Sequence, residues 1–482
     1  MNLRAIAIYI GHILKLEGFF MLPALVLAWG HDEAAAFRAF VVTVLLLLGL
    51  GFLLTRVSDN VKSIYAREGF VTVAFGWIAI SFFGALPFFI SGVIPSFMDC
   101  WFETVSGFTT TGASILPEVE SLPKSLLYWR SFTNWLGGMG VLVFMLAVVP
   151  HSQGSGETMH LFRAESPGPT VGKLSPTIRV TTRILYSIYI VLTLVQIVLL
   201  LAGGMPLFDA LTHAFATAGT GGFSIKNASI AAYDSAYIQT VIGVFMALFG
   251  VNFNIFYLLL IGKIGMALKN EELRAYFGIM ALAVAIITLD VRAMYESFGK
   301  ALLDSFFQVS TVMTTTGFAT ADFNLWPQLS RYILVVLMII GASAGSTGGG
   351  IKVMRLLILG KAARSEMLTL AHPRAVRPPR MDGKKIEDGV VRGTYAFMTV
   401  YAVICVASMA LLTLDNFSME TTFTAVIACV NNIGPGLDVV GPVGNYSGLS
   451  TLSKGVLTLD MLFGRLEIFP MIMLFSRENW KH

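Results

Sequence analysis

Four short glycine-containing turns hold the residues of this 482-residue chain that are best suited to binding an ion. Backbone carbonyls arranged in rings can replace the hydration shell of a small cation. Threonine hydroxyls can add oxygen ligands, and glycine accepts the backbone angles that aim consecutive carbonyls inward. The predicted filter residues are Thr110, Thr111 and Gly112; Thr220, Gly221 and Gly222; Thr315, Thr316 and Gly317; and Asn432, Ile433 and Gly434.

The turns recur about every 100 residues, which indicates a repeated unit. An acidic residue precedes each turn by about 12 residues of apolar sequence, and an acid suits the N-terminus of a short helix. Crossing the hydrocarbon core takes about 20 helical residues, so this segment is too short to span a membrane. Each unit is therefore predicted to be a span, a half-helix, a turn and a second span. The four acids are Asp99, Asp209, Asp304 and Glu420.

Composition places the whole chain in a lipid bilayer. Hydrophobic residues make up 55% of the chain and charged residues 13%, and the mean hydropathy is +0.74. Soluble domains carry about 25% charged residues. These values exclude an ordinary soluble enzyme, a disordered chain and a nucleic-acid binder. About two thirds of the 33 lysines and arginines fall in cytoplasmic segments if the N-terminus is cytoplasmic and the chain crosses ten times, which is the expected orientation.

The sequence thus predicts an all-α integral membrane fold with four span–pore-helix–filter–span repeats around a pseudo-fourfold pore. Two extra N-terminal transmembrane helices bring the total to about ten spans. Irregular backbone at membrane depth survives only where protein buries it or where it lines a water-filled cavity, so the turns should line the pore. The expected divisions are 1–66 for the extra spans, and 67–150, 151–265, 266–370 and 371–482 for the four repeats.

A glycine-rich stretch at 341–351 interrupts the span that follows the third turn. Five glycines in ten residues disfavour a helix, at about 1 kcal/mol each. A phosphate-binding loop is excluded because Ile351 follows the last glycine, where such a loop needs lysine. We expect an unwound loop under the filter that blocks the pore and moves aside, and the alternative is a helix-packing seam. The predicted gating residues of the loop are Gly345, Ser346, Thr347, Gly348, Gly349 and Gly350.

Arg465 is the other predicted gating residue. It lies in the last apolar run between Asp460 and Glu467, and helical spacing turns neither acid toward it. A buried arginine in lipid normally points to a partner or a water-filled cavity. We expect its guanidinium to face the inner cavity, to contact the glycine loop or the hydroxyls beside it, and to form a positive barrier. The alternative is an arginine that snorkels to the cytoplasmic surface.

The chain resembles the Trk/Ktr/HKT superfamily of cation transport proteins, most closely its bacterial TrkH branch. The resemblance rests on the four turns, on the motif NWLGGMG at 134–140 and on GRLEIFP at 464–470. It implies K⁺ uptake across the bacterial inner membrane, with no organic cofactor in the chain and with both termini cytoplasmic. It also implies a homodimer and a cytosolic, nucleotide-binding regulatory ring of the RCK type (TrkA-like). The carbonyls that would hold K⁺ are those of Thr110, Thr111, Thr220, Gly221, Thr315, Thr316, Asn432 and Ile433.

Several alternatives remain at this point. An ion-coupled secondary transporter, moving K⁺ with H⁺ or Na⁺, would also place irregular backbone in the membrane, but that class favours two inverted repeats. An enzyme is not expected, because Glu103, His213, Asp460 and Glu467 are spread over three units without catalytic spacing. The basic segment 364–392 suits either anionic membrane lipids or a regulatory subunit. The sequence gives no sign of a nucleic-acid partner.

Overall fold

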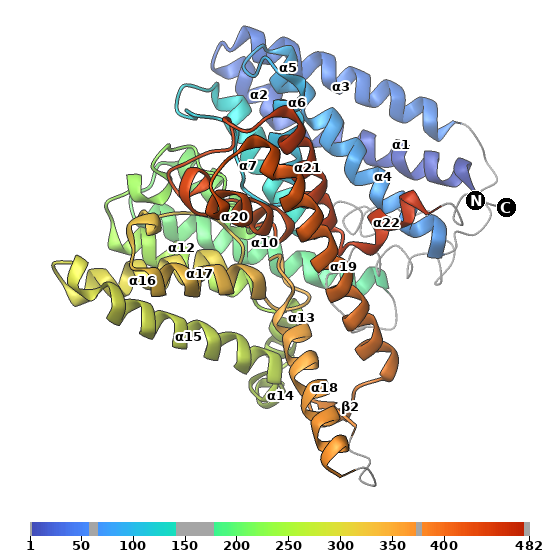
Figure 1. Ribbon diagram of the computed structural model, residues 1–482. Helices are drawn as coiled ribbons and strands as arrows, with labels where there is room; N and C mark the ends of the chain where they lie inside the picture. Colours follow the sequence, from blue (N-terminus) through green and yellow to red (C-terminus); the bar gives the residue numbers. More distant parts are fainter. Residues whose placement is uncertain (1, 57–65, 141–177, 373–377, 477–482) are drawn as a thin grey trace.

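A computed structural model describes residues 2–56, 66–140, 178–372 and 378–476. These residues are mostly helical, and their strands form one antiparallel pair of two residues each, β1 (Arg380–Met381) and β2 (Lys384–Lys385). Figure 1 shows this small hairpin at the lower end of the molecule beside α18, far from the N-terminal helices at the top. The predicted cytoplasmic loop 151–176 lies outside the described residues.

In the described part of the chain, six helices are long and apolar enough to cross a membrane, and they establish an all-α membrane protein. They cover Leu3–Gly30, Ala34–Thr55, Glu68–Ile90, Val180–Ala202, Glu271–Met294 and Asp388–Asp415. A seventh candidate joins Ala236–Phe249 to Phe253–Leu260 across a 93° bend. At the remaining three predicted positions the helices are shorter: α7 (Lys124–Gly138), α17 (Gln328–Ile340) and α21 (Thr451–Arg465).

The first two candidate spans belong to an N-terminal group that packs against the rest. It consists of α1 (Leu3–Phe20) and α2 (Leu22–Gly30), which together make the first span, and α3 (Ala34–Thr55). Pro23 stands at the start of α2, where a missing N–H costs no helical hydrogen bond. Helices α1 and α3 pack along each other, and α1 also contacts α4.

Each of the four repeats has a long helix, a short pore helix and a second, shorter or broken segment. The long helices are α4 (Ala66–Gly84) with α5 (Leu86–Ile90), α10 (Ile178–Ala202), α15 (Glu271–Val291) and α19 (Asp388–Leu412). The pore helices are α6 (Phe97–Phe108), α11 (Leu207–Ala218), α16 (Phe298–Met313) and α20 (Met419–Val430). The second segments are α7; α12 (Ala236–Phe249) with α13 (Phe253–Leu260); α17 with α18 (Val353–Ala371); and α21 with α22 (Phe469–Phe475). The short α14 (Ile264–Lys269) joins repeats two and three.

The repeats close into a ring through their pore helices. Each pore helix packs against the second segment of the preceding repeat: α11 on α7, α16 on α12, α20 on α17 and α6 on α21. The last contact joins repeat four back to repeat one, which completes the circle. This arrangement brings four turns that are far apart in sequence to one place.

One predicted feature of the repeats differs in the structure. Asp99, Asp209 and Glu420 lie in the first turn of their pore helices, as expected for N-terminal acids. Helix α16 instead has 16 residues and begins at Phe298, where Ser297 caps it by accepting from the N–H of Lys300. Asp304 therefore lies well inside the helix, because Ser297 starts the helix about one turn earlier than the repeat pattern predicts.

The predicted division points remain predictions. The division between 66 and 67 falls at the start of α4, and the one between 150 and 151 lies outside the described residues. The other two fall within helices, at 265/266 in α14 and at 370/371 in the last turn of α18. The repeats are therefore joined by helices as well as by loops.

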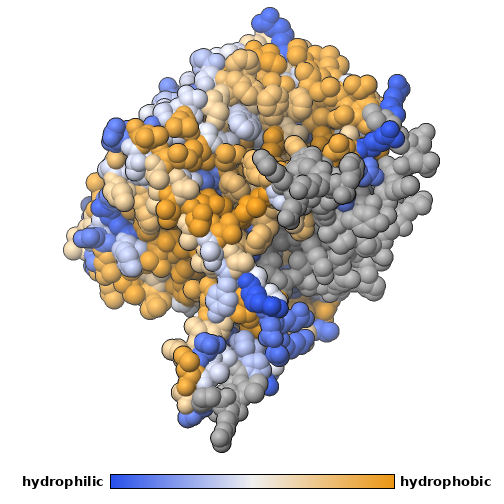
Figure 2. All heavy atoms as spheres, turned by 45° about the vertical axis from the view of Figure 1, so that its right-hand side comes forward, coloured by the Kyte–Doolittle hydropathy of each residue, from blue (hydrophilic) through white to orange (hydrophobic). Residues whose placement is uncertain are grey.

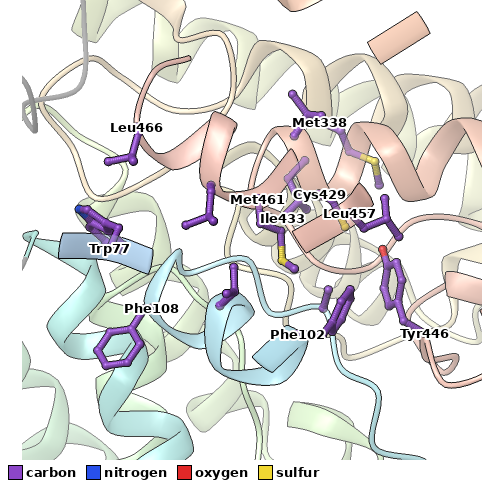
Figure 3. Close-up of a cluster of buried hydrophobic side chains, with 14 of the residues drawn as sticks. Trp77, Phe102, Phe108, Met338, Cys429, Ile433, Tyr446, Leu457, Met461 and Leu466 are labelled. Atoms are coloured by element: carbon purple, nitrogen blue, oxygen red, sulfur yellow. The ribbon is translucent and has the colours of Figure 1, made fainter. Parts of the chain in front are cut away.

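Apolar side chains cover much of the surface, as a lipid-facing protein requires. Figure 2 shows hydrophobic residues spread over the main body, with hydrophilic ones gathered at the edges and on the projection at the bottom, where Figure 1 places α18 and β2. Inside, a large cluster of buried residues joins the N-terminal helices and all four repeats. Figure 3 shows part of it, with Ile433 of the fourth turn near Met461 of α21 and Phe102 near Tyr446.

Candidate functional site

All four pore helices end in the same hydrogen-bonded turn. In repeat one, the Thr110 N–H donates to the carbonyl of Gly107 (3.1 Å) and the Thr111 N–H to that of Ser106 (2.8 Å). These two bonds define a Schellman turn, which closes the C-terminus of a helix. The same pair of bonds recurs at Thr220 and Gly221, at Thr315 and Thr316, and at Asn432 and Ile433.

The filter backbone alternates its conformation in each repeat. A left-handed residue lies two positions before each glycine, with φ between 54° and 58°, and each glycine is left-handed again, with φ between 67° and 93°. A β-branched threonine rarely adopts such an angle, and residues held this way cluster at functional sites. From the sequence, unusual backbone angles were expected only at the glycines. The first set is Thr110, Thr220, Thr315 and Asn432, and the second is Gly112, Gly222, Gly317 and Gly434.

The four filter glycines interlock with their neighbours around a closed ring. A Cβ on Gly112 would lie within 3.0 Å of the Gly221 carbonyl oxygen, a distance that real Cβ atoms essentially never show. The same holds for Gly222 against Thr316, for Gly317 against Ile433 and for Gly434 against Thr111. Each glycine therefore makes room for a backbone carbonyl of the next repeat, and the fourth makes room for the first. This ring brings together all four predicted filter segments.

A cavity of about 180 Å³ lies at the outer side of this ring. All four filter glycines line it, together with Arg130 and residues of the loop at 440–446. The Tyr446 hydroxyl donates to the Gly434 carbonyl (2.6 Å), which fixes the outer end of the fourth turn. No carboxylate is among the residues that line the cavity in the described part of the chain, and its charged side chains are those of Arg130 and Lys226.

The chain that leaves each filter is tied back to its own pore helix. Glu103 accepts from the Ser114 hydroxyl (3.0 Å) and from the Ile115 N–H (2.9 Å). The equivalent His213 bonds to the Ser224 hydroxyl (3.0 Å), and the Gln308 amide oxygen accepts from the N–H groups of Thr320 and Ala321. In repeat four, where Ala425 cannot bond, the neighbouring Thr424 accepts from the Leu437 N–H (2.9 Å). The polar residues nine positions before the glycines are thus structural and not catalytic.

The four acids that precede the turns are engaged with other groups. Asp99 pairs with Lys454 (2.7 Å), Glu420 pairs with Arg331, and Asp304 accepts from Thr320 (3.0 Å). Asp209 accepts from the Tyr233 hydroxyl (2.6 Å). Farther out, hydrogen bonds from Ser418 and Thr421 hold the pKa of Asp438 below its usual range. Asp304 also pairs with Lys300 (3.2 Å), so Asp99, Asp304 and Glu420 each have a basic partner.

The inner ends of the filters carry a set of threonine and asparagine side chains. The Thr109 and Thr111 hydroxyls share a hydrogen bond (2.8 Å), and so do those of Thr314 and Thr316. The Asn432 amide donates to the Thr111 hydroxyl (3.0 Å) and so links repeat four to repeat one. These side chains are buried, which lets their hydroxyls brace the filter backbone.

The glycine-rich stretch is an unwound loop directly beneath these groups. Helix α17 ends at Ile340 and α18 begins at Val353, with no helix between them. The Gly349 N–H donates to the Thr315 hydroxyl (2.6 Å), and the Gly350 N–H donates to the Asn431 carbonyl (3.1 Å). On the other side, the Thr347 hydroxyl donates to the Phe249 carbonyl (3.2 Å), at the bend between α12 and α13. The loop is thus held by repeats two, three and four.

Arg465 joins this loop to repeat one. It is the last residue of α21, not an internal residue of a continuous span, because the helix is interrupted between Leu466 and Ile468. Its guanidinium donates to the carbonyls of Thr347 (2.9 Å), Gly138 (2.7 Å) and Gly137, and to the Thr110 hydroxyl (3.3 Å). The predicted contact with the glycine loop is therefore present, and the guanidinium also reaches the inner end of filter one.

Three charged residues near the loop were not identified from the sequence as part of the site. Lys352, which has φ of 81° and is buried, donates to the Gly348 carbonyl. Glu272 accepts from the Ala344 N–H (2.7 Å). Arg355 pairs with Glu467 and stacks on a phenylalanine ring, which links α18 to the break after α21. Charged residues beside a glycine-rich break in an apolar run were the signal that could have revealed them.

Comparisons with known proteins agree along the whole chain. A sequence profile described as TrkH, cation transport protein, matches residues 33–482. The chain is 36% identical to the Trk system potassium uptake proteins TrkH of Salmonella typhimurium and of Escherichia coli K12, and each alignment covers 100% of both proteins. The crystal structure of the potassium transporter TrkH from Vibrio parahaemolyticus superposes with a TM-score of 0.88 at 33% identity, again over 100% of both chains.

Proposed function

Because this chain belongs to the TrkH family of cation transport proteins, we propose that it takes up K⁺ through a gated pore with a four-segment glycine filter. The family consists of transport proteins and not enzymes, and the chain is a multi-pass membrane protein. K⁺ is the transported ion of the relatives named above. In this proposal K⁺ moves down its electrochemical gradient, and the chain itself supplies no energy.

The observation that carries the proposal is the closed ring of glycines and carbonyls. Four backbone segments with alternating left-handed residues meet at one point, and each is locked against the next by a glycine–carbonyl approach. Such a ring offers successive layers of oxygen ligands to an ion that sheds its water. The ligands in this proposal are the carbonyls of the two residues before each glycine. The hydroxyls of Thr111 and Thr316 are held by hydrogen bonds to the hydroxyls of Thr109 and Thr314.

Transport by this purified chain provides the direct test. Reconstituted into liposomes loaded with K⁺, it should accumulate ⁸⁶Rb⁺ through exchange, and external K⁺ should compete better than Na⁺ or Li⁺. In planar bilayers, resolvable unitary currents support passive conduction. Slow flux that strictly requires an H⁺ or Na⁺ gradient would instead support the ion-coupled transporter. Absence of any K⁺ or Rb⁺ movement by folded protein would reject both.

We assign the gate to the loop at 341–351 together with Arg465. The loop contacts the inner ends of filters three and four through Thr315 and Asn431, and Arg465 ties it to filter one. A loop that lies directly under the filter obstructs the path of the ion. Opening then requires these hydrogen bonds to break and α18, which continues from the loop, to move.

Replacing Gly349 by alanine is expected to raise resting flux. A Cβ there would lie within 3.0 Å of the Asn431 carbonyl, so the loop could not keep its place under the filter. Losing one or two hydrogen bonds of about 1 kcal/mol each should raise the open fraction about tenfold. ⁸⁶Rb⁺ uptake by liposomes measures the effect. Gly360→Ala in α18, where a Cβ meets nothing within 4 Å, is the matched control. Unchanged uptake in Gly349→Ala would argue against the loop as a gate.

Partners and location follow from the same family membership. We propose that the chain is an inner-membrane protein with cytoplasmic termini, that two copies form a homodimer, and that a nucleotide-binding ring of the RCK type regulates it. The hairpin β1–β2 offers exposed basic residues at the base of α18, and Asp382 fixes it to α15 through the Glu271 N–H (2.8 Å). A regulatory subunit that docked on this basic projection would act on the helix that continues into the loop. Anionic membrane lipids are the other partner that suits these charges.

A further inference from the structure

At the position nine residues before the filter glycine, repeat one has one member of a buried ion pair, whereas the other repeats have neutral residues there. The Arg130 Nε lies 2.7 Å from the Glu103 carboxylate, and the two side chains are 4% and 1% exposed. The residues equivalent to Glu103 in the other repeats are His213, Gln308 and Ala425. Neutral contacts are therefore enough to tie a filter to its pore helix. A charge pair in the same place, which is costly to bury unless it is well bonded, calls for a separate explanation.

The ion pair contacts two filters at once. Glu103 accepts from Ser114 and Ile115, which leave the first filter just beyond Gly112. Arg130 donates through Nη1 to the Ser224 carbonyl (2.9 Å), just beyond the second filter glycine. The pair therefore connects the outer ends of filters one and two through a continuous set of hydrogen bonds.

A second contact fixes Arg130 on the second filter. Its guanidinium carbon lies 3.6 Å from the centre of the Phe223 ring, and Phe223 is the residue directly after Gly222. A planar guanidinium that stacks on an aromatic ring while bonding at its edge has little freedom to move. Arg130 also lines the outer cavity with all four filter glycines. The position of the Arg130 side chain thus sets the distance between filters one and two.

We propose that Glu103 and Arg130 form a positioning unit that determines ion specificity, by fixing the spacing of filters one and two. The proposal rests on the proposed K⁺ function. Selectivity depends on the number and field strength of the carbonyls around the ion and on how freely they move. Filters held apart by a rigid pair cannot contract around the smaller Na⁺. Released from the pair, filters one and two can approach each other, and Na⁺ then gains ligands at a shorter distance.

The variant Glu103→Gln tests this proposal because it removes the charge and keeps the size of the side chain. We expect the Na⁺/K⁺ permeability ratio to rise about tenfold, which corresponds to about 1.4 kcal/mol of discrimination. The ratio is measured from reversal potentials of the reconstituted protein with K⁺ on one side and Na⁺ on the other. A role in folding alone would reduce the amount of active protein and leave the ratio of the active fraction unchanged.

Two further variants complete the test. Glu296→Gln removes an exposed carboxylate from the segment before α16, outside the cavity lining, and should leave the ratio unchanged. Arg130→Lys keeps the charge but loses the planar fork that bonds Ser224 and stacks on Phe223, so it should also raise the ratio. If Glu103→Gln does not fold, Arg130→Lys decides the question. A wild-type ratio in either folded variant overturns the positioning role, whereas a wild-type protein without K⁺ selectivity overturns the proposed function instead.

Discussion

Gly317→Ser is expected to remove most of the discrimination between K⁺ and Na⁺ while the protein still folds. Gly317 has φ of 91°, and a Cβ there would lie within 3.0 Å of the Ile433 carbonyl oxygen. A left-handed conformation costs a non-glycine residue about 1–2 kcal/mol, and the side chain must also push away a carbonyl of the fourth filter. Displacing one oxygen from the ring alters the ligand field for every ion that passes. We expect the Na⁺/K⁺ permeability ratio to rise by about tenfold or more.

Reversal potentials in planar bilayers, with K⁺ and Na⁺ on opposite sides, measure this ratio. Gly299→Ser is the matched control, because it makes the same change in the same repeat, at the start of α16, where a Cβ meets nothing within 4 Å. Size-exclusion profiles should be alike for the two variants, and thermal melting should show Gly317→Ser folded at the temperature of the recordings, although less stable than Gly299→Ser. If folded Gly317→Ser kept the permeability ratio of the parent chain, the turns would not be the filter.

Arg465→Ala is expected to increase resting K⁺ flux more than any other single change at the gate. The guanidinium bonds the carbonyl of Thr347 in the loop, two carbonyls of repeat one and the Thr110 hydroxyl. Hydrogen bonds from a charged group contribute about 1.5–3 kcal/mol each, so losing a net 3 kcal/mol from the closed state should raise the open fraction about a hundredfold. Alanine also removes a positive charge from the path of the cation.

Uptake of ⁸⁶Rb⁺ by liposomes, without any regulatory partner, measures this resting flux. Arg465→Lys separates the two causes, because it keeps the charge and loses the forked hydrogen bonds. The surface variant Arg274→Ala, which removes a charge from the exposed side of α15, is the control for changes in expression and insertion. Flux in Arg465→Ala equal to that of the parent chain, with unchanged response to a regulatory subunit, would mean that Arg465 has no part in gating.

Much of the fold follows from local sequence. Apolar runs of about 20 residues gave the long helices, since hydrophobic length reports directly on the bilayer. The pore helices and turns were predicted from a repeated pattern of an acid, a short apolar stretch and a glycine. This pattern could be recognised because it depends only on residues that are close together in the chain. The glycine-rich break after the third turn was also predictable, since glycine disfavours a helix wherever it stands. Two features differed: Ser297 starts α16 earlier than the repeat pattern indicates, and α7, α17 and α21 are shorter than the predicted spans.

Other features were decided by contacts between residues far apart in the chain. Closing four units into one ring gives Thr110 and Asn432 their left-handed backbone conformation. It also places each filter glycine against a carbonyl of the next repeat. The partners of Arg465, and the pairing of Glu103 with Arg130 across two filters, arise in the same way. Sequence periodicity describes the backbone over a few turns of helix and does not show which repeats lie side by side. The residues by themselves therefore determined what each segment is, and the packing of the ring determined what each side chain touches.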